Sequence, residues 1–334
     1  MRAYEIISDG GVDALALNQR QTSEPGEGEI LVAVRASAIN YRDLSTIEDP
    51  VPRGIAFPRI PNSDGAGEVI AVGAGVTRFK TGDRVAGCFF QNWSDGRISA
   101  AAMASAMGGP VDGILAEQAL LSETGAVHIP LHMSYQEGAT LPCAGVTAWN
   151  CLVEQGGLKA GNTALFLGTG GVSIFGLQIA KMMGARAIIT SSSDDKLKRA
   201  KGLGADELIN YRQTPDWEAQ VLEMTNGTGV DVTIETGGGG TLEKTMEATR
   251  VGGTISLIGV LTGGTINPTT VMRKSIRLQG VYVGSRRMFE DMNAAFALNQ
   301  VHPVIDRVFD FEDARAAYHA MRAAGHFGKL VVKV

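Results

Sequence analysis

The chain has 334 residues, and at roughly 150 residues per domain this length predicts two domains. Hydrophobic residues make up 44% and charged residues 19%, a composition that supplies a core and excludes a disordered chain. The 30 basic and 35 acidic residues give a net charge of −5 without a Lys/Arg block, so we expect no nucleic-acid partner.

The three cysteines, Cys88, Cys143 and Cys151, show no CxxC spacing, so neither a disulfide framework nor a Cys-rich zinc site is expected. The N-terminus has no apolar run of the length that a secretory signal needs. Thr163 to Ala180 carries no charge, but its four glycines predict a strand, a turn and a helix rather than a membrane span. We therefore expect a cytoplasmic protein with no membrane contact.

The first 125 residues or so are β-like and rich in Pro and Gly, which indicates a small barrel with irregular connections. The predicted strands are Ile30–Ala38, Gly67–Val72 and a short one within 82–87. Residues 93–113 are rich in small side chains and weakly patterned, and we expect a mobile loop there.

From about residue 130, short apolar runs alternate with helical segments, which predicts a parallel, doubly wound sheet of the α/β class. The predicted strands are Ala164–Leu167, Ala187–Thr190, Glu207–Ile209, Val230–Glu235, Thr254–Ile258 and Ile276–Val281. The predicted helices are Val172–Met183, Lys196–Leu203, 217–225 and 241–250. The tail, with helices Phe289–Asn299 and Phe311–Ala323 and strands Val304–Phe309 and Lys329–Val334, returns to a different unit.

A glycine turn lies between the first of these strands and its helix, in the run Gly168-Thr169-Gly170-Gly171-Val172-Ser173. This context is typical of a dinucleotide site, where backbone N–H groups at a helix N-terminus face the pyrophosphate. Gly168, Gly170, Gly171 and Val172 are the predicted cofactor contacts. Ser173 departs from the third glycine of the motif and should crowd the packing of helix on strand. The alternative is a glycine turn that serves packing alone.

The residues at the end of the second predicted strand of this sheet, Ala187–Thr190, distinguish an NAD site from an NADP site. An NAD site has Asp or Glu at this position, where it binds the ribose. This chain has Thr190-Ser191-Ser192 there, and the Ser191 and Ser192 hydroxyls together with Lys196 can bind a 2′-phosphate. Tyr211 and Arg212 follow the third strand and can close over the adenosine end. Alternatively, Ser193 is a helix N-cap with Asp194 and Asp195 in the first turn, which is compatible with a phosphate site. We expect NADP(H).

The chain resembles the medium-chain dehydrogenase/reductase superfamily over essentially its whole length. The segments that carry the resemblance are 61–69 (PNSDGAGEV), 82–85 (GDRV), 141–149 (LPCAGVTAW), the glycine turn, 196–197 (KL) and 203–206 (LGAD). The resemblance implies a GroES-like catalytic domain, 1–127 and 288–334, around a Rossmann domain, 128–287. It also implies a cofactor cleft between the two domains and, commonly, a homodimer.

The family divides into zinc alcohol dehydrogenases and zinc-free reductases. Zinc members carry Cys where this chain has Asn40, and His-Glu where it has Ser63-Asp64. Only Cys143 is of a ligand type, and one thiol does not hold a catalytic zinc. His128 and His132 flank Pro130 and are expected to be ordinary loop or surface residues. The chain therefore resembles the zinc-free, quinone-oxidoreductase-like branch, with no metal.

In that branch the resemblance places Asn40 and Thr147 beside the nicotinamide. It also implies that the nicotinamide ring is lined by Gly259, Val260, Leu261, Val283, Gly284 and Ser285. Phe327 and Lys329, from the C-terminal segment that returns to the catalytic domain, are implied to approach the same ring. Tyr41 and Asp43 follow Asn40 and are candidates for substrate-side polar groups. Alternatively, Tyr41 is a packing aromatic, and Asp43 pairs with Arg42 or caps a turn.

The predicted function is a zinc-independent, NADP(H)-dependent oxidoreductase that transfers a hydride to a quinone, an enone or a related small carbonyl substrate. Asn40, Tyr41, Asp43 and Thr147 are the candidate catalytic residues. One alternative is a zinc-free alcohol dehydrogenase or ketone reductase. Another is a non-catalytic NADPH-binding structural or sensor protein.

Overall fold

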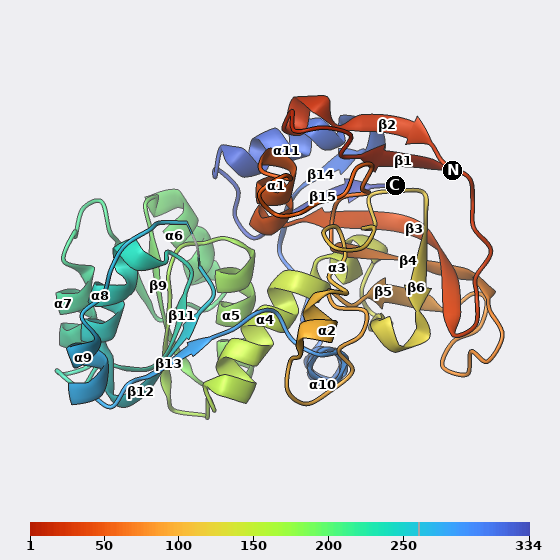
Figure 1. The fold of residues 1–334 in the computed structure, drawn as a ribbon. Helices are drawn as coiled ribbons and strands as arrows, with labels where there is room; N and C mark the ends of the chain where they lie inside the picture. The colour runs from red at the N-terminus through yellow and green to blue at the C-terminus, as the bar shows by residue number, and fades with distance from the viewer. Residues whose placement is uncertain (260) are drawn as a thin grey trace. The chain divides into compact units, whose positions relative to one another are not determined.

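The computed structural model describes residues 1–259 and 261–334, and the chain divides into two compact units (Figure 1). One unit comprises Met1–Val146 and Val283–Val334, and the other comprises Thr147–Tyr282. The resemblance implied bounds at 127/128 and 287/288, whereas residues 128–146 belong with the first unit. The reason is that helix α3 (Tyr135–Ala139) packs against strands of that unit.

The first unit is built on a seven-stranded sheet in which strands from the first 128 residues pair with the C-terminal strand. Its sheet order is β14-β15-β3-β4-β5-β7, and β6 also pairs with β3. The strands are β3 (Glu29–Ile39), β4 (Asp64–Val72), β5 (Arg84–Gly87), β6 (Gln118–Ser122), β7 (Ala126–His128), β14 (Ile305–Asp310) and β15 (Lys329–Lys333), beside a separate pair β1 (Arg2–Glu5) and β2 (Ala16–Gln19). The helices are α1 (Tyr41–Glu48), α2 (Ala100–Met103), α3, α10 (Arg286–Asn299) and α11 (Ala314–Arg322).

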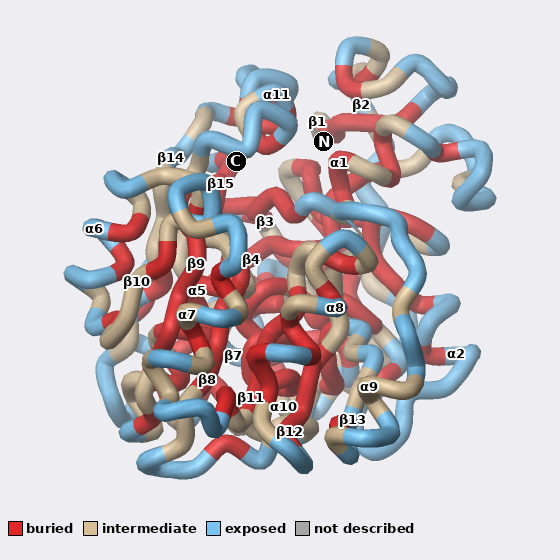
Figure 2. Tube along the Cα trace, turned by 90° about the vertical axis from the view of Figure 1, so that its left-hand side faces the viewer, coloured by how far each residue is buried: buried red, intermediate tan, exposed pale blue. Residues whose placement is uncertain are grey.

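Strand β3 is the centre of this unit because it is long, rich in aliphatic side chains and buried along most of its length (Figure 2). It pairs antiparallel with β4 and with β15, so that Ser37 lies opposite both Gly65 and Val332. The register of β15 also places Leu330 opposite Ile39, the last residue of β3. The C-terminal strand therefore delivers Lys329 to the end of β3, next to Asn40.

The second unit is a parallel six-stranded sheet in the order β10-β9-β8-β11-β12-β13. Its elements are β8 (Thr163–Phe166), α5 (Gly171–Met182), β9 (Arg186–Ser191), α6 (Asp194–Gly202), β10 (Glu207–Asn210), α7 (Trp217–Met224), β11 (Val230–Glu235), α8 (Gly239–Ala248), β12 (Thr249–Leu257), α9 (Pro268–Arg273) and β13 (Arg277–Gly280), preceded by α4 (Val146–Trp149). Counted within the unit, this order is 3-2-1-4-5-6, the doubly wound arrangement that binds dinucleotides where the strand order reverses. The α/β class and the Rossmann-like sheet expected from the sequence are confirmed.

Five helices of the described part of the chain were not expected, namely α1, α2, α3, α4 and α9. Residues 93–113 contain α2, a single turn of alanines that starts at Ser99, whose hydroxyl accepts a hydrogen bond from the Ala102 N–H. A capping serine followed by alanines suffices for such a turn, although the segment has no amphipathic pattern. Helix α1 begins directly after Asn40 and has a half-polar sequence. Among the described residues, no helix combines the length and the apolar character needed to cross a bilayer.

Candidate functional site

The glycine turn of the second unit leaves open space at the start of a helix. Gly168 takes φ 73°, a conformation that favours glycine, and its N–H donates to Thr190 Oγ1 over 3.3 Å. Gly170 is the N-cap of α5 in an extended conformation, and a Cβ added there would meet no protein atom within 4 Å. The space beside Gly170 is therefore open to a ligand, at the N-terminus of a helix of 12 residues. Gly171 and Val172 form the first turn of this helix.

Ser173 does not crowd the packing of helix on strand. Its side chain is buried, and its hydroxyl donates to the Leu167 carbonyl over 2.7 Å. The close approach of α5 to the sheet occurs at Gly176 instead, where a Cβ would lie 2.7 Å from Phe166. The third glycine of the motif is thus replaced by a hydrogen bond and by a glycine one turn later.

The end of β9 carries hydroxyl groups and no carboxylate. Thr190 and Ser191 are buried and Ser192 is partly exposed. Ser193 is the N-cap of α6, as its hydroxyl accepts from the Lys196 N–H, and Asp194 follows it in the first turn. Both of the roles considered for this segment, a cap and a phosphate site, remain compatible.

The other residues predicted to contact the cofactor in the second unit are Tyr211, Gly259, Val260, Leu261 and Thr147. Tyr211 is 42% exposed, and its N–H donates to the Ser191 carbonyl, so these two predicted contacts are neighbours. Gly259 lies against the backbone of Thr236, and Leu261 is exposed. Thr147 is buried in α4. Val260 lies outside the described residues.

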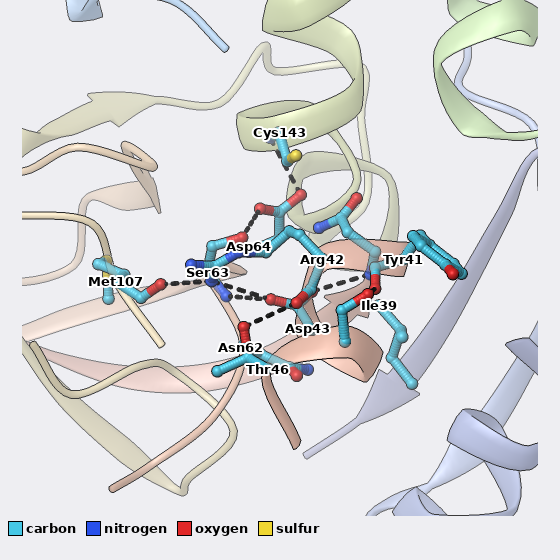
Figure 3. Close-up of polar contacts among 12 residues, drawn as sticks. Ile39, Tyr41, Arg42, Asp43, Thr46, Asn62, Ser63, Asp64, Met107 and Cys143 are labelled. Atoms are coloured by element: carbon cyan, nitrogen blue, oxygen red, sulfur yellow. Dashed lines mark hydrogen bonds and ion pairs between the residues drawn. The ribbon is translucent and has the colours of Figure 1, made fainter. Parts of the chain in front are cut away.

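The first unit holds a buried polar centre at the start of α1 (Figure 3). Asn40 is its N-cap and is 8% exposed. Asp43 has no exposed surface, and its carboxylate accepts from the Asn40 N–H over 2.8 Å and from Arg42 over 3.1 Å. Asp43 thus fulfils both structural alternatives, the cap and the pair with Arg42, and a role toward the substrate stays a prediction.

Asp64 is a residue that sequence reasoning did not select, and it is completely buried beside Asp43. Its carboxylate accepts from the Ser63 hydroxyl over 2.6 Å and from the Cys143 N–H over 3.0 Å. Burial raises the pKa of Asp64 from 3.8 to about 6, and the charge of Asp43 acts in the same direction, while the charge of Lys329 and the Ser63 hydrogen bond oppose the rise. The available signal was the polar run 62–64, which leads into the strand that starts at Asp64.

Behind Asp64, a second set of buried groups holds this polar run in place. Asn62 takes φ 69° with no exposed surface, a conformation uncommon outside glycine. Its amide donates to Ser37, whose hydroxyl donates to the Asp64 carbonyl, and its Oδ1 accepts from the Tyr318 hydroxyl. Strand β3, helix α11 and the start of β4 are thereby joined.

Lys329 belongs to the same centre. It is 3% exposed, and its Nζ donates to the Ile39 carbonyl over 2.9 Å and to Asn40 Oδ1 over 2.5 Å. The structure therefore brings two predicted site residues, Lys329 and Asn40, into direct contact.

The remaining predicted residues of this unit are Tyr41, Val283, Gly284, Ser285 and Phe327. Tyr41 is 46% exposed, and its ring points away from Asp43 and Asp64 (Figure 3). It lines a cavity of about 250 Å³ with Leu44, Ser45, Glu48, Asp49 and Arg322. Val283 takes φ 56°, a costly conformation for a β-branched residue, and Ser285 is the N-cap of α10. Gly284 is packed against Val146 and Met288, and Phe327 is buried.

The two histidines considered as ligands have other partners. His128 contacts Asp83 over 3.2 Å, and His132 contacts the Val301 carbonyl over 2.9 Å. Among the described residues no group of three or more His, Cys, Asp or Glu side chains could hold a metal.

The donor set of the polar centre does not fit zinc. Zinc prefers thiolate, imidazole and carboxylate ligands in a tetrahedron. Here the positions where the zinc members carry ligands hold an amide (Asn40), a hydroxyl (Ser63) and the thiol of Cys143, whose pKa is raised by desolvation. The Asp64 carboxylate is of a ligand type, but it already accepts hydrogen bonds from Ser63 and from the Cys143 N–H. The ammonium of Lys329 also lies against Asn40, and a cation there repels a metal ion.

Family models match both units of the chain. The alcohol dehydrogenase GroES-like domain matches residues 26–131, and the zinc-binding dehydrogenase domain matches residues 171–299. A zinc-type alcohol dehydrogenase-like protein of Schizosaccharomyces pombe is 43% identical over 315 residues, which are 92% of this chain and 91% of that protein. The chain belongs to the medium-chain dehydrogenase/reductase superfamily. A quinone oxidoreductase of Pseudomonas aeruginosa is 33% identical over 266 residues, 78% of this chain and 74% of that enzyme.

Solved structures of this superfamily have the same fold. A Sinorhizobium meliloti protein, provisionally named an alcohol dehydrogenase, superposes with a TM-score of 0.93 at 40% identity, covering 100% of this chain and 98% of that one. A mycobacterial protein in complex with NADPH superposes with a TM-score of 0.84 at 25% identity, covering 100% of both chains. The GroES-like and Rossmann-like architecture and the oxidoreductase class are thus established for this chain.

Proposed function

We propose that this protein is a zinc-independent, NADP(H)-dependent oxidoreductase that transfers a hydride to a quinone, an enone or a related conjugated carbonyl compound. The observation that carries the proposal is the polar centre at Asn40, whose amide, hydroxyl and ammonium groups replace the ligand types of a catalytic zinc. A reductase that lacks a Lewis acid depends on substrates whose developing charge is delocalised. Quinones and enones are such substrates.

The cofactor proposal rests on the second unit. The open space at Gly170 and the helix N-terminus of α5 suit a pyrophosphate. The hydroxyl groups of Ser191 and Ser192, with Lys196 in the next helix, suit a 2′-phosphate, and no carboxylate stands at 190–192 to repel it. When bound, the reduced nicotinamide supplies a hydride, and the residues of the chain orient it and exclude water.

The family resemblance supports two further parts of the proposal. Members of this superfamily are commonly homodimers, and we extend this state to the present chain. We also propose a cytoplasmic location, which agrees with its three unpaired cysteines.

A panel assay tests the proposed function. Purified protein is mixed with NADPH and, in separate reactions, with quinones, enones, aldehydes and simple ketones, and NADPH oxidation is followed by absorbance. Steady oxidation is expected with quinones or enones and only slow oxidation with unactivated ketones. Fast oxidation with simple ketones or aldehydes alone would replace the proposal by its main rival.

That rival is an alcohol dehydrogenase or ketone reductase. It is favoured by the names of two similar proteins, the Schizosaccharomyces pombe relative and the Sinorhizobium meliloti structure. A protein that binds NADPH but oxidises it with no compound of the panel would instead be a structural or sensor protein.

A further inference from the structure

Lys329 and Asn40 form the rim of the buried polar centre. Asp43 and Asp64 have no exposed surface, whereas Asn40 and Lys329 retain 8% and 3%. A small molecule that reaches the centre therefore meets hydrogen-bond donors before it meets a carboxylate. The two donors are held together, because Lys329 Nζ lies 2.5 Å from Asn40 Oδ1.

Both side chains keep donor capacity that the protein does not use. An ammonium has three protons, and in the described structure Lys329 donates two hydrogen bonds, to Ile39 and to Asn40. The Asn40 Nδ2 group is buried and makes no hydrogen bond of normal geometry with a described residue, although the amide lies near enough to Asp64 to favour its charged form. A buried donor without an acceptor is costly and calls for an explanation.

The charges around the pair favour a ligand oxygen that becomes negative. The centre contains two carboxylates, Asp43 and Asp64, and two cations, Arg42 and Lys329. Arg42 is committed to Asp43 and to the Met107 carbonyl. The Asp64 carboxylate already accepts from Ser63 and Cys143. Lys329 acts on Asp64 through its charge but forms no ion pair within 4 Å with a described carboxylate, so its ammonium can also face a ligand oxygen.

We propose that Lys329 Nζ and Asn40 Nδ2 together bind the carbonyl oxygen of the substrate and stabilise the negative charge that develops on it during hydride transfer. This inference rests on the proposed function and names its electrophilic residues. It assigns to a buried lysine and an amide the stabilisation that a metal provides in other reductases. It also assigns Lys329 to the substrate, where the sequence had suggested the cofactor.

The proposed step is the reduction of an enone by hydride transfer. A hydride brings two electrons to the β-carbon of the enone, the C=C π pair moves to the adjacent carbon, and charge is delocalised onto the carbonyl oxygen. Lys329 keeps its proton and acts as a hydrogen-bond donor throughout. A proton from solvent then completes the saturated ketone, while NADPH becomes NADP⁺.

Binding of 4-nitrophenolate to the NADP⁺-loaded protein tests the pair without turnover. This anion carries its charge on an oxygen conjugated with a planar ring, and its absorption distinguishes it from neutral 4-nitrophenol. The uncharged 4-nitroanisole, which has the same ring, is the control ligand. We expect the wild type to favour the phenolate, and the double variant Lys329→Met/Asp64→Asn to bind it about tenfold more weakly with little change for 4-nitroanisole.

Two different variants are used so that a folding defect in one of them does not prevent the test. The double variant removes one buried charge of each sign, and Asn40→Ser removes the amide but keeps a residue suited to an N-cap. Lys333→Met, on the exposed side of β15, is the matched control and should bind the phenolate as the wild type does. The proposal is wrong if Asn40→Ser and the double variant bind phenolate normally, or if they weaken NADP⁺ binding alone. Absence of enone turnover in the wild type would instead overturn the proposed function and leave the phenolate result to decide the pair.

Discussion

The side chain of Lys329 donates a hydrogen bond to that of Asn40, although 289 residues separate them in the sequence. The contact exists because β15 pairs antiparallel with β3, which aligns the C-terminal strand with the segment that ends at Asn40. The candidate substrate site of the first unit is therefore assembled from both ends of the chain.

The first prediction concerns the glycine turn. Gly170→Ala should leave the melting temperature unchanged, because the new Cβ meets no protein atom and the backbone there is extended. It should weaken NADPH binding at least about tenfold by occupying the space of the pyrophosphate. Fluorescence titration and thermal unfolding measure both quantities. Gly202→Ala, at another open glycine, is the control, and normal binding by Gly170→Ala would reduce the turn to a packing feature.

The second prediction concerns the choice of cofactor. NADPH should bind more tightly than NADH, and Lys196→Glu should narrow or reverse this difference because a carboxylate repels the 2′-phosphate. Lys198→Glu, an exposed position of the same helix, makes the same charge change as a control. Fluorescence titration with both cofactors gives the ratio. Equal affinities that Lys196→Glu does not alter would contradict the phosphate-site assignment.

The third prediction concerns metal. Protein purified without a chelator should contain no stoichiometric zinc and should keep its activity in EDTA, because the groups at Asn40, Ser63 and Cys143 do not form a zinc ligand set. Elemental analysis and an assay in EDTA check this. One tightly held zinc per chain, as the name of the Schizosaccharomyces pombe relative allows, would overturn it.

The sequence predicted the second unit well and the candidate substrate site less well, for a physical reason. The glycine turn, α5 and the end of β9 are local features, since a strand, a turn and a helix follow one another within some thirty residues and each carries its own pattern. The environment of Asp64 depends on strand pairing across the whole chain. Nothing local to Lys329 shows that its ammonium is buried, whereas Asn40 followed by Asp43 three residues later is a local signal for a helix start.

The fourth prediction concerns the pH dependence of stability. The pKa of Asp64 is raised to about 6 in the folded protein, so the folded state binds the proton more tightly than the unfolded state. The contribution of Asp64 to the free energy of unfolding should therefore fall as the pH rises from about 4 to 6, by up to about 3 kcal/mol, and stay level above. Carboxylates whose pKa is lowered, such as Glu117 and Asp206, contribute with the opposite sign, so the difference between the wild type and Asp64→Asn isolates this contribution. In Asp64→Asn this fall should disappear. Urea unfolding across this pH range measures it, with Asp9→Asn, an exposed position, as control, and a wild-type slope that survives in Asp64→Asn would refute it.

Transfer of deuterium from labelled NADPH tests the central claim most directly. Zinc-free protein in EDTA is given NADPH that carries deuterium at the transferable C4 position, together with an enone, and the product is analysed by mass spectrometry and NMR. We predict a saturated ketone that carries deuterium at its β-carbon, because the hydride passes directly from the cofactor to a conjugated substrate. Oxidation of NADPH without label in the product, or transfer that appears only after zinc is added, would contradict the account.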